Sequence, residues 1–344
     1  MNKLSGIIAF ALTVIGLGSA VCGCSMIDDG RDDCFSDLTI AYEMRLVTNR
    51  QPEIDSVLSA PSDIYVKKAL EDHLSGIFSD YGRGLELSFY APASVDPAVK
   101  ETKSMEAVRK EFPFTMDPGD WFHTAMANGD CSKETLVSRD GYQYAESHKA
   151  GLFSGRKSFT LVPGNNPGIE VGLYMVNSGT ALVVETSKAP EIDPSGITIY
   201  VTGFADGFNV ADSVFTYPST FYRVNTVDLP VSEGTEKCYA AVHFPSRDPR
   251  IDPTVGVRSV TETVEPFRWP ETPKPIWEWV GYVKRPDGKT TETVLGIRKP
   301  LRAGQLKILK VFVDDDGRLL TDDPEVAVSV NLDWQPGLDF EPFL

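Results

Sequence analysis

Apolar and polar residues alternate along much of this chain of 344 residues, and a period of two is typical of β-strands with one buried face. Near the N-terminus, the stretch 37–46 places Thr39, Glu43 and Arg45 on one face. Its other face is apolar and consists of Leu38, Ile40, Tyr42, Met44 and Leu46. The stretch 326–334 repeats this pattern with Val326, Val328, Val330, Leu332 and Trp334. Both stretches predict strands of a sheet that is buried on one side.

Further apolar or alternating runs predict the strands that lie between these two. They cover residues 85–91, 157–162, 169–176, 181–186, 196–204, 237–244, 277–283 and 306–313. Two turn-forming runs end in Gly288 and Gly317, and glycine readily adopts the positive φ that tight hairpin turns need. We expect each of these glycines to close a β-hairpin.

One segment follows a helical period instead. After Pro61, apolar residues recur every third or fourth position as far as Phe78, and Gly82 ends the segment. Because the remainder is strand or loop, the sequence predicts an all-β fold with one short helix.

About 320 residues remain once a signal peptide is removed, more than one core usually supports, so we expect two β-sandwich domains in series. Two prolines and several charges interrupt the strand-like sequence between Lys188 and Pro194. The predicted domains are therefore 36–189, which holds the inserted helix, and 190–344.

The N-terminus has the features of a lipoprotein signal. Lys3 precedes an apolar run that is too short to cross a bilayer comfortably, and small residues follow. Residues 21–24 fit the small tetrad that closes on the lipid-bearing cysteine of bacterial lipoproteins, at Cys24. We expect residues 1–23 to be removed and Cys24 to carry acyl chains of the palmitate type, in which each buried methylene contributes roughly 0.8 kcal/mol. Residues 24–35 would form an acidic tether.

Two alternatives apply to this cysteine. Cys22 and Cys24 are too close for a zinc knuckle, which argues against a metal site. A plain signal peptide that is cleaved elsewhere would leave Cys24 unmodified. The acidic residues after Cys24 are similar to the signal by which Bacteroidota send lipoproteins to the outer face of the outer membrane, and they also suit a solvated spacer.

The chain is acidic, with 33 Lys and Arg against 49 Asp and Glu and a net charge of −16. Such a surface repels nucleic acids and anionic lipids, which argues against DNA or RNA partners and against electrostatic membrane binding. Attachment to a membrane would therefore depend on the acyl chains.

Three cysteines remain beyond Cys24. Cys34 and Cys131 lie in polar, loop-like sequence and could form a disulfide in an oxidising envelope, although spacing does not fix their pairing. Cys238 alternates with apolar residues of a predicted strand, so we expect a buried small hydrophobe.

No constellation of residues indicates an enzyme, a cofactor or a metal ion. The histidines are scattered without metal-ligand spacing and are expected to be structural or at the surface. They are His73, His123, His148 and His243. Runs that resemble a nucleophile elbow, a phosphate loop and a calcium loop each lack a defining residue.

The richest aromatic stretch holds Trp269, Trp277 and Trp279 among several prolines. Exposed tryptophans would suit a stacking platform for sugar rings or a surface for a protein partner. Trp277 and Trp279 also lie on one face of a predicted strand, so they could instead fill the second core.

Both ends of the chain resemble the FimB/Mfa2 family of fimbrial anchor proteins from Bacteroidales. Residues 299–337 are similar to a strand-turn-strand in that family that ends in alternating valines and Leu-Asp-Trp. The start is similar too, with a lipoprotein cysteine at Cys24, an acidic linker, and Cys34 ahead of the first alternating strand. The part between the two ends matches only in layout.

The resemblance implies two tandem transthyretin-like β-sandwich domains at the base of a fimbria of the type V pilus kind. An anchor of this family would be held by lipid on the outer membrane and would contact a stalk subunit by β-strand pairing. Stalk relatives lose their first strand to a protease that cuts after arginine, which draws attention to Arg45 and Arg50. The tail 337–344 could be a short donor strand or a frayed end.

The sequence therefore predicts a surface lipoprotein of anchor type that binds a stalk subunit at its sheet edges. A stalk or accessory subunit of the fimbria is one alternative. A lipid-anchored glycan-binding protein that uses the tryptophan stretch is the other.

Overall fold

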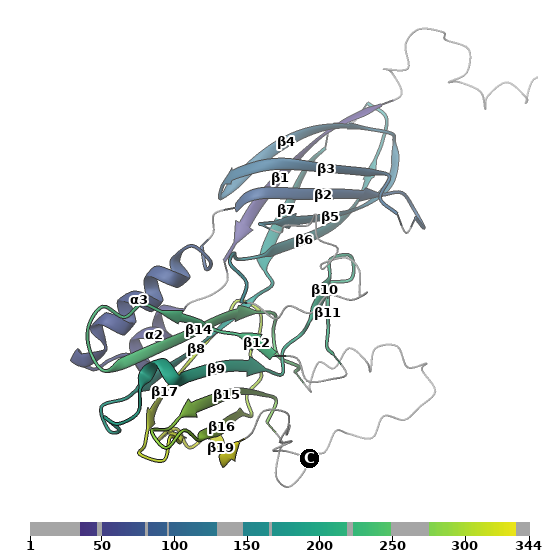
Figure 1. Ribbon diagram of the computed structural model, residues 1–344. Coiled ribbons are helices and arrows are strands. Elements are labelled where there is room, and N and C mark those ends of the chain that lie inside the picture. Colours follow the sequence, from purple (N-terminus) through teal and green to yellow (C-terminus); the bar gives the residue numbers. More distant parts are fainter. Residues whose placement is uncertain are drawn as a thin grey trace, which may run out of the picture.

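The computed structural model describes residues 35–46, 50–79, 82–94, 96–128, 147–164, 167–218, 223–248 and 275–334. These residues form two β-structures, which Figure 1 shows one above the other, and two helices beside the lower one. The fold is all-β, as predicted. No helix in the described ranges is long and apolar enough to cross a membrane.

The first β-sandwich consists of one seven-stranded sheet, in the order β3-β2-β5-β6-β7-β1-β4, which folds back on itself. Its strands are β1 (Ser36–Arg45), β2 (Gly82–Tyr90), β3 (Val99–Ala107), β4 (Arg109–Met116), β5 (Gly119–Ala127), β6 (Phe153–Leu161) and β7 (Gly168–Met175). The sheet folds where β6 meets β7, because these strands share two residue pairs only. Strands β2 and β4 thereby face each other, with the rings of Phe89 and Phe114 5.1 Å apart.

Strand β1 lies inside this sheet, antiparallel to β4 and parallel to β7. Its apolar face is buried as the alternation predicts: Leu38, Ile40, Tyr42 and Met44 are each at most 3% exposed. The hydroxyl of Tyr42 lies 2.8 Å from Nε2 of His123 in β5, across the core. In the strand order β1 alone joins β4 to β7, so it completes the sandwich from within.

The second β-sandwich packs two five-stranded sheets, β12-β9-β15-β16-β19 and β13-β14-β8-β17-β18, against each other. Their strands are β8 (Ser178–Glu185), β9 (Ile197–Thr202), β12 (Arg223–Asn225), β13 (Val227–Leu229), β14 (Glu236–His243), β15 (Trp277–Lys284), β16 (Thr290–Ile297), β17 (Leu306–Val313), β18 (Leu319–Leu320) and β19 (Val326–Trp334). A small hairpin of β10 (Gly207–Asn209) and β11 (Val214–Thr216) stands apart from both sheets. Trp277, Trp279 and Leu295 fill the core between the two sheets.

Both predicted turn glycines close hairpins. Gly288 has φ of 83° between β15 and β16, and Gly317 has φ of 74° between β17 and β18. This left-handed region is strained for residues with a Cβ, which explains glycine at both turns.

The structure has two helices where the sequence predicts one, and it places them differently. Helix α2 (Gln51–Val57) precedes a short 3₁₀ turn and helix α3 (Ile64–Ser75). The sequence predicts a helix inserted in the first sandwich, but both helices pack on the second: α2 contacts β17, and α3 contacts β13 and β14. The reason is that the outer face of that sheet is apolar, with Cys238 and Ile308 at most 1% exposed, and the helices cover it.

The predicted domain boundary does not lie where the chain changes from one sandwich to the other. Strand β8, which the sequence analysis assigns to the first domain, pairs with β14 and with β17 of the second sandwich. The proline-containing run 188–194 therefore connects two strands of the same sandwich. The chain passes from the first sandwich to the second between β7 and β8, at residues 176–177.

Candidate strand-pairing site

Strand β19 forms an edge of the second sandwich: among the described strands it pairs only with β16. Val328 pairs with Leu295, and directly paired residues of antiparallel strands share a face. Leu295 is fully buried, so Val328 is on the inward side of the sheet. Even so, Val328 and Leu332 are 40% and 38% exposed.

The short strand β18 explains this exposure. Its Leu319 lies against β15, where a Cβ added to Gly281 would be 2.3 Å from Leu319 Cδ1. The Leu319 N–H donates to Thr293 Oγ1 of β16, at 3.1 Å. The opposite sheet thus ends over β15 and β16 and leaves the inward face of β19 partly uncovered. An edge strand with alternate exposed apolar side chains can accept an extended chain from a partner.

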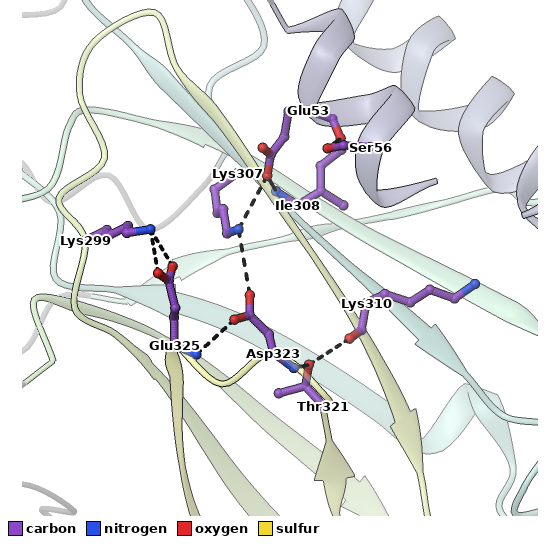
Figure 2. Close-up of polar contacts among 9 residues, drawn as sticks. All are labelled: Glu53, Ser56, Lys299, Lys307, Ile308, Lys310, Thr321, Asp323 and Glu325. Carbon is purple, nitrogen blue, oxygen red and sulfur yellow. Dashed lines mark hydrogen bonds and ion pairs between the residues drawn. The ribbon is translucent and has the colours of Figure 1, made fainter. Parts of the chain in front are cut away.

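The neighbouring edge, on β17, is occupied by side chains instead (Figure 2). Strand β18 pairs with β17 only at Phe312 and Val313, so the first part of β17 has no strand on that side among those described. The Ile308 N–H donates to Glu53 Oε1 of α2, at 3.0 Å, and Thr321 Oγ1 donates to the Lys310 carbonyl, at 3.1 Å.

Arg45 and Arg50, the two candidate cleavage sites, both form side-chain hydrogen bonds. Arg45 is the last residue of β1, and its guanidinium forms an ion pair with Glu43 at 2.9 Å and hydrogen-bonds the Tyr174 hydroxyl. The guanidinium of Arg50 donates to the carbonyls of Leu74 and Phe78, at 2.8 and 3.0 Å, and burial lowers its pKa.

The structure places two of the three singled-out tryptophans in the core. Trp277 and Trp279 are 1% and 0% exposed, and their rings pack edge-on at 4.6 Å. Neither ring can stack on a sugar, so the prediction of a contact surface is wrong for these two residues. Their alternative position, in the second core, is the one observed. The alternation of β15 is compatible with either face, which is why the sequence left both interpretations open.

A different aromatic surface, which the sequence analysis missed, lies on the first sandwich. A cavity of about 340 Å³ is lined by Pro92, Asp120, Trp121, Phe122, Ser158, Phe159 and Thr160. Thr160 Oγ1 donates to Asp120 Oδ1 at 2.5 Å, which fixes the carboxylate beside the rings. The only sequence signal is the Trp-Phe pair that follows Asp120 in β5.

Three of the histidines are neutral; His123 and His243 are buried, and His148 is half-buried. Burial lowers the pKa of His123 and of His148 to about 4 and that of His243 to about 3. Burial also raises the pKa of the Cys238 thiol to about 12, so this cysteine is the inert buried residue predicted. Within the described part of the chain, no group of three or more His, Cys, Asp and Glu residues could hold a metal ion.

Several predicted features lie outside the described residues: the signal 1–23, Cys24, Cys34, Cys131, Trp269 and the tail 337–344. The acylation and the disulfide therefore stay predictions.

No protein-family profile matches this sequence, and no curated protein matches it either. Solved structures with a similar arrangement include a candidate adhesin from Bacteroides thetaiotaomicron, at 9% identity and a TM-score of 0.45, covering 86% of this chain and 96% of that one. A candidate polysaccharide-binding protein from the same organism has 8% identity and a TM-score of 0.47, covering 85% and 97%. The tip fimbrial protein Mfa3 of Porphyromonas gingivalis, truncated at its C-terminus, has 12% identity and a TM-score of 0.38, covering 87% and 100%. Because identities and TM-scores are this low, we base the function on the residues and geometry of this chain.

Proposed function

We propose that this chain is a cell-surface fimbrial lipoprotein of the anchor type. Acyl chains on Cys24 hold it on the outer membrane, residues 24–35 act as a tether, and the second sandwich binds a stalk subunit by strand pairing. The observation that carries this proposal is the edge of β19, where Val328 remains exposed on the inward side of the sheet and Leu332 is exposed farther along the same strand.

A stalk strand that pairs with β19 gains in two ways. Its backbone completes the ladder on the edge of β19, and its inward side chains pack beside Val328, Val330 and Leu332. Apolar residues at every second position of the partner strand would fit this surface, because successive side chains of a strand point to opposite faces.

The placement of β1 supports an anchor rather than a stalk subunit. A protease that cuts after Arg45 or Arg50 needs an extended, accessible chain around the arginine. Arg45 is paired in the sheet with Tyr174, and Arg50 is bound to two carbonyls of the α3 region. The retained β1 fills the position between β4 and β7 that a donor strand would otherwise take, so we assign the strand-accepting edge to the second sandwich.

The β19 edge can be tested with Val328→Lys combined with Leu332→Lys. Lysine on an edge strand opposes strand addition because its charge would have to be buried. We expect the amount of fimbrial subunit that copurifies with the protein from native cells to fall at least tenfold. Both side chains are more than a third exposed, so the melting temperature should change little.

Val162→Lys is the matched control, because Val162 is 54% exposed and lies beyond β6 in the first sandwich. It should copurify subunits as the unmodified chain does. Undiminished copurification with the two β19 lysines would refute the proposed site.

The stalk alternative is separated by mass spectrometry of the surface form. An acylated N-terminal Cys24 supports the anchor, whereas a new N-terminus directly after Arg45 or Arg50 supports a processed stalk or accessory subunit.

The cavity beside Trp121 favours glycan binding as a second candidate function. Its rings offer apolar faces, and Asp120, Ser158 and Thr160 offer polar groups for sugar hydroxyls. We expect titration with cellobiose, chitobiose or mannobiose to shift the tryptophan fluorescence, and Phe122→Ala to abolish the shift. Absence of any shift with the unmodified chain, or a shift that survives Phe122→Ala, would exclude this cavity for these sugars.

A further inference from the structure

The two edges on this side of the second sandwich differ in how their backbone groups are used. Alternate residues of a strand direct their N–H and C=O groups to opposite sides. Ile308 and Lys310 point away from β8, toward the side where β17 has no described strand partner over most of its length. Glu53 and Thr321 bind these two residues, as Figure 2 shows, and leave less of the edge for a foreign strand.

We propose that helix α2 guards the edge of β17, meaning that its Glu53 occupies the Ile308 N–H and so prevents a foreign strand from pairing there. Of these two edges, only that of β19 then accepts a strand. This inference rests on the proposed function for its biological meaning, because it leaves one acceptor edge instead of two on this side of the second sandwich. An anchor with one acceptor edge on this side receives one stalk strand there.

Contacts on the sheet and contacts between the helices both hold Glu53 in this position. On the sheet side, Lys307 lies between Glu53, at 3.6 Å, and Asp323, at 4.0 Å. Asp323 belongs to the loop that leads into β19, so the same network separates the two edges (Figure 2).

On the helix side, Ile54 is fully buried in the core, and Arg50 joins the start of α2 to the end of α3. Gln51 also hydrogen-bonds Glu71 of α3, at 3.0 Å. These contacts hold Glu53 against β17 without help from a partner. The carboxylate occupies the place that a backbone carbonyl of an added strand would take.

The test uses Glu53→Ala in the chain that already carries Val328→Lys and Leu332→Lys, so that the β19 edge is blocked. We expect the amide of Ile308 to exchange with deuterium about five to ten times faster, as loss of one hydrogen bond implies. The amide of Leu309, which points toward β8, should exchange at its former rate. Sedimentation velocity at protein concentrations from about 1 to about 100 μM should show at least tenfold stronger self-association, because two freed β17 edges can pair.

Two matched variants control this experiment. Glu53→Gln keeps a carbonyl oxygen for the Ile308 N–H and should behave as the parent chain does. Asp55→Ala removes a carboxylate from the exposed face of the same helix, where it pairs with Lys67 at 2.5 Å. It should leave both readouts unchanged.

Faster exchange without self-association would mean that Glu53 caps β17 but does not guard it, and would overturn the proposal. Equal self-association in Asp55→Ala would also overturn it, because looser helix docking would then be the cause. Both readouts are taken with the β19 edge blocked and without a stalk subunit. Failure of the stalk-binding proposal therefore leaves this result intact, and the reverse holds.

Discussion

A chain that begins at Arg50 is expected to lose the cooperative unfolding transition of its first sandwich. Four side chains of the missing β1, Leu38, Ile40, Tyr42 and Met44, are at most 3% exposed. Burial of each contributes roughly 1.5–3 kcal/mol, so about 6–12 kcal/mol is lost for the four, and a whole domain is stable by only about 5–15 kcal/mol. Strands β4 and β7 would also lose every backbone pairing that β1 supplies. Urea unfolding followed by near-ultraviolet circular dichroism measures this loss.

A synthetic peptide of residues 36–46, added in excess, should restore the transition by filling the slot between β4 and β7. The same peptide with Ile40→Asp should not, because the fully buried Ile40 would become an uncompensated charge. A shortened chain that unfolds cooperatively without peptide would show that the sandwich does not depend on β1. The protein could then lose this strand in the cell and still be folded.

Alternation identifies the strands with apolar faces and misses those with polar ones. The stretches that form β1, β15 and β17 carry continuous apolar faces, and the structure confirms all three. Strand β3, by contrast, has Met105 as its one fully buried side chain, and its remaining positions are mostly charged or polar. An edge strand that packs on one side of a rolled sheet needs few apolar residues, so its pattern is weak.

Sequence pattern also identifies strands more readily than their partners. Strand β8 is predicted, yet it pairs with β14 and β17, which follow far along the chain. The prolines near residue 190 indicate a domain boundary by their pattern, but they belong to the connection between β8 and β9. Helix α2 is only seven residues long, which is too short for a helical period to appear.

The candidate site is predictable only in part. The alternation of β19 predicts an edge or a buried strand equally well, because exposure of Val328 depends on β18 ending after Leu320. The role of Glu53 could not be predicted, since it joins residues 255 positions apart. The resemblance at both ends of the chain is the sequence feature that directs attention to sheet edges.

The second large effect is expected at Lys310, which holds the helices to the second sandwich. Its ammonium lies 2.5 Å from Asp63, just before α3, and 2.7 Å from Glu236 in β14. Both carboxylate side chains are nearly buried, at 2% and 7% exposure. Burial is the largest influence on Asp63 and would raise its pKa, but the hydrogen bonds from Lys310 and from the Ala60 N–H, together with the charge of Lys310, outweigh burial and lower the pKa. Burial raises the pKa of Glu236.

Lys310→Met should therefore destabilise the protein by about 3–5 kcal/mol at pH 7, because two buried carboxylates lose their counter-ion. Asp63, with its lowered pKa, contributes stability above its unfolded value of 3.8, and this is lost as the pH falls further. The methionine variant has no such contribution to lose, and its carboxyls become neutral in acid. The deficit measured by urea unfolding should accordingly shrink as the pH falls from 7 to below 3.8.

Two further variants decide whether charge is the cause. Lys307→Met, on the same strand, removes longer ion pairs of 3.6 and 4.0 Å and should cost less than about 1 kcal/mol. Adding Asp63→Asn and Glu236→Gln to Lys310→Met removes the unpaired charges, and the new amide at position 63 still offers an oxygen to the Ala60 N–H. Most of the stability should return. If it does not, packing of the lysine stem rather than its charge fixes α3 on the sheet, and the deficit should then be independent of pH.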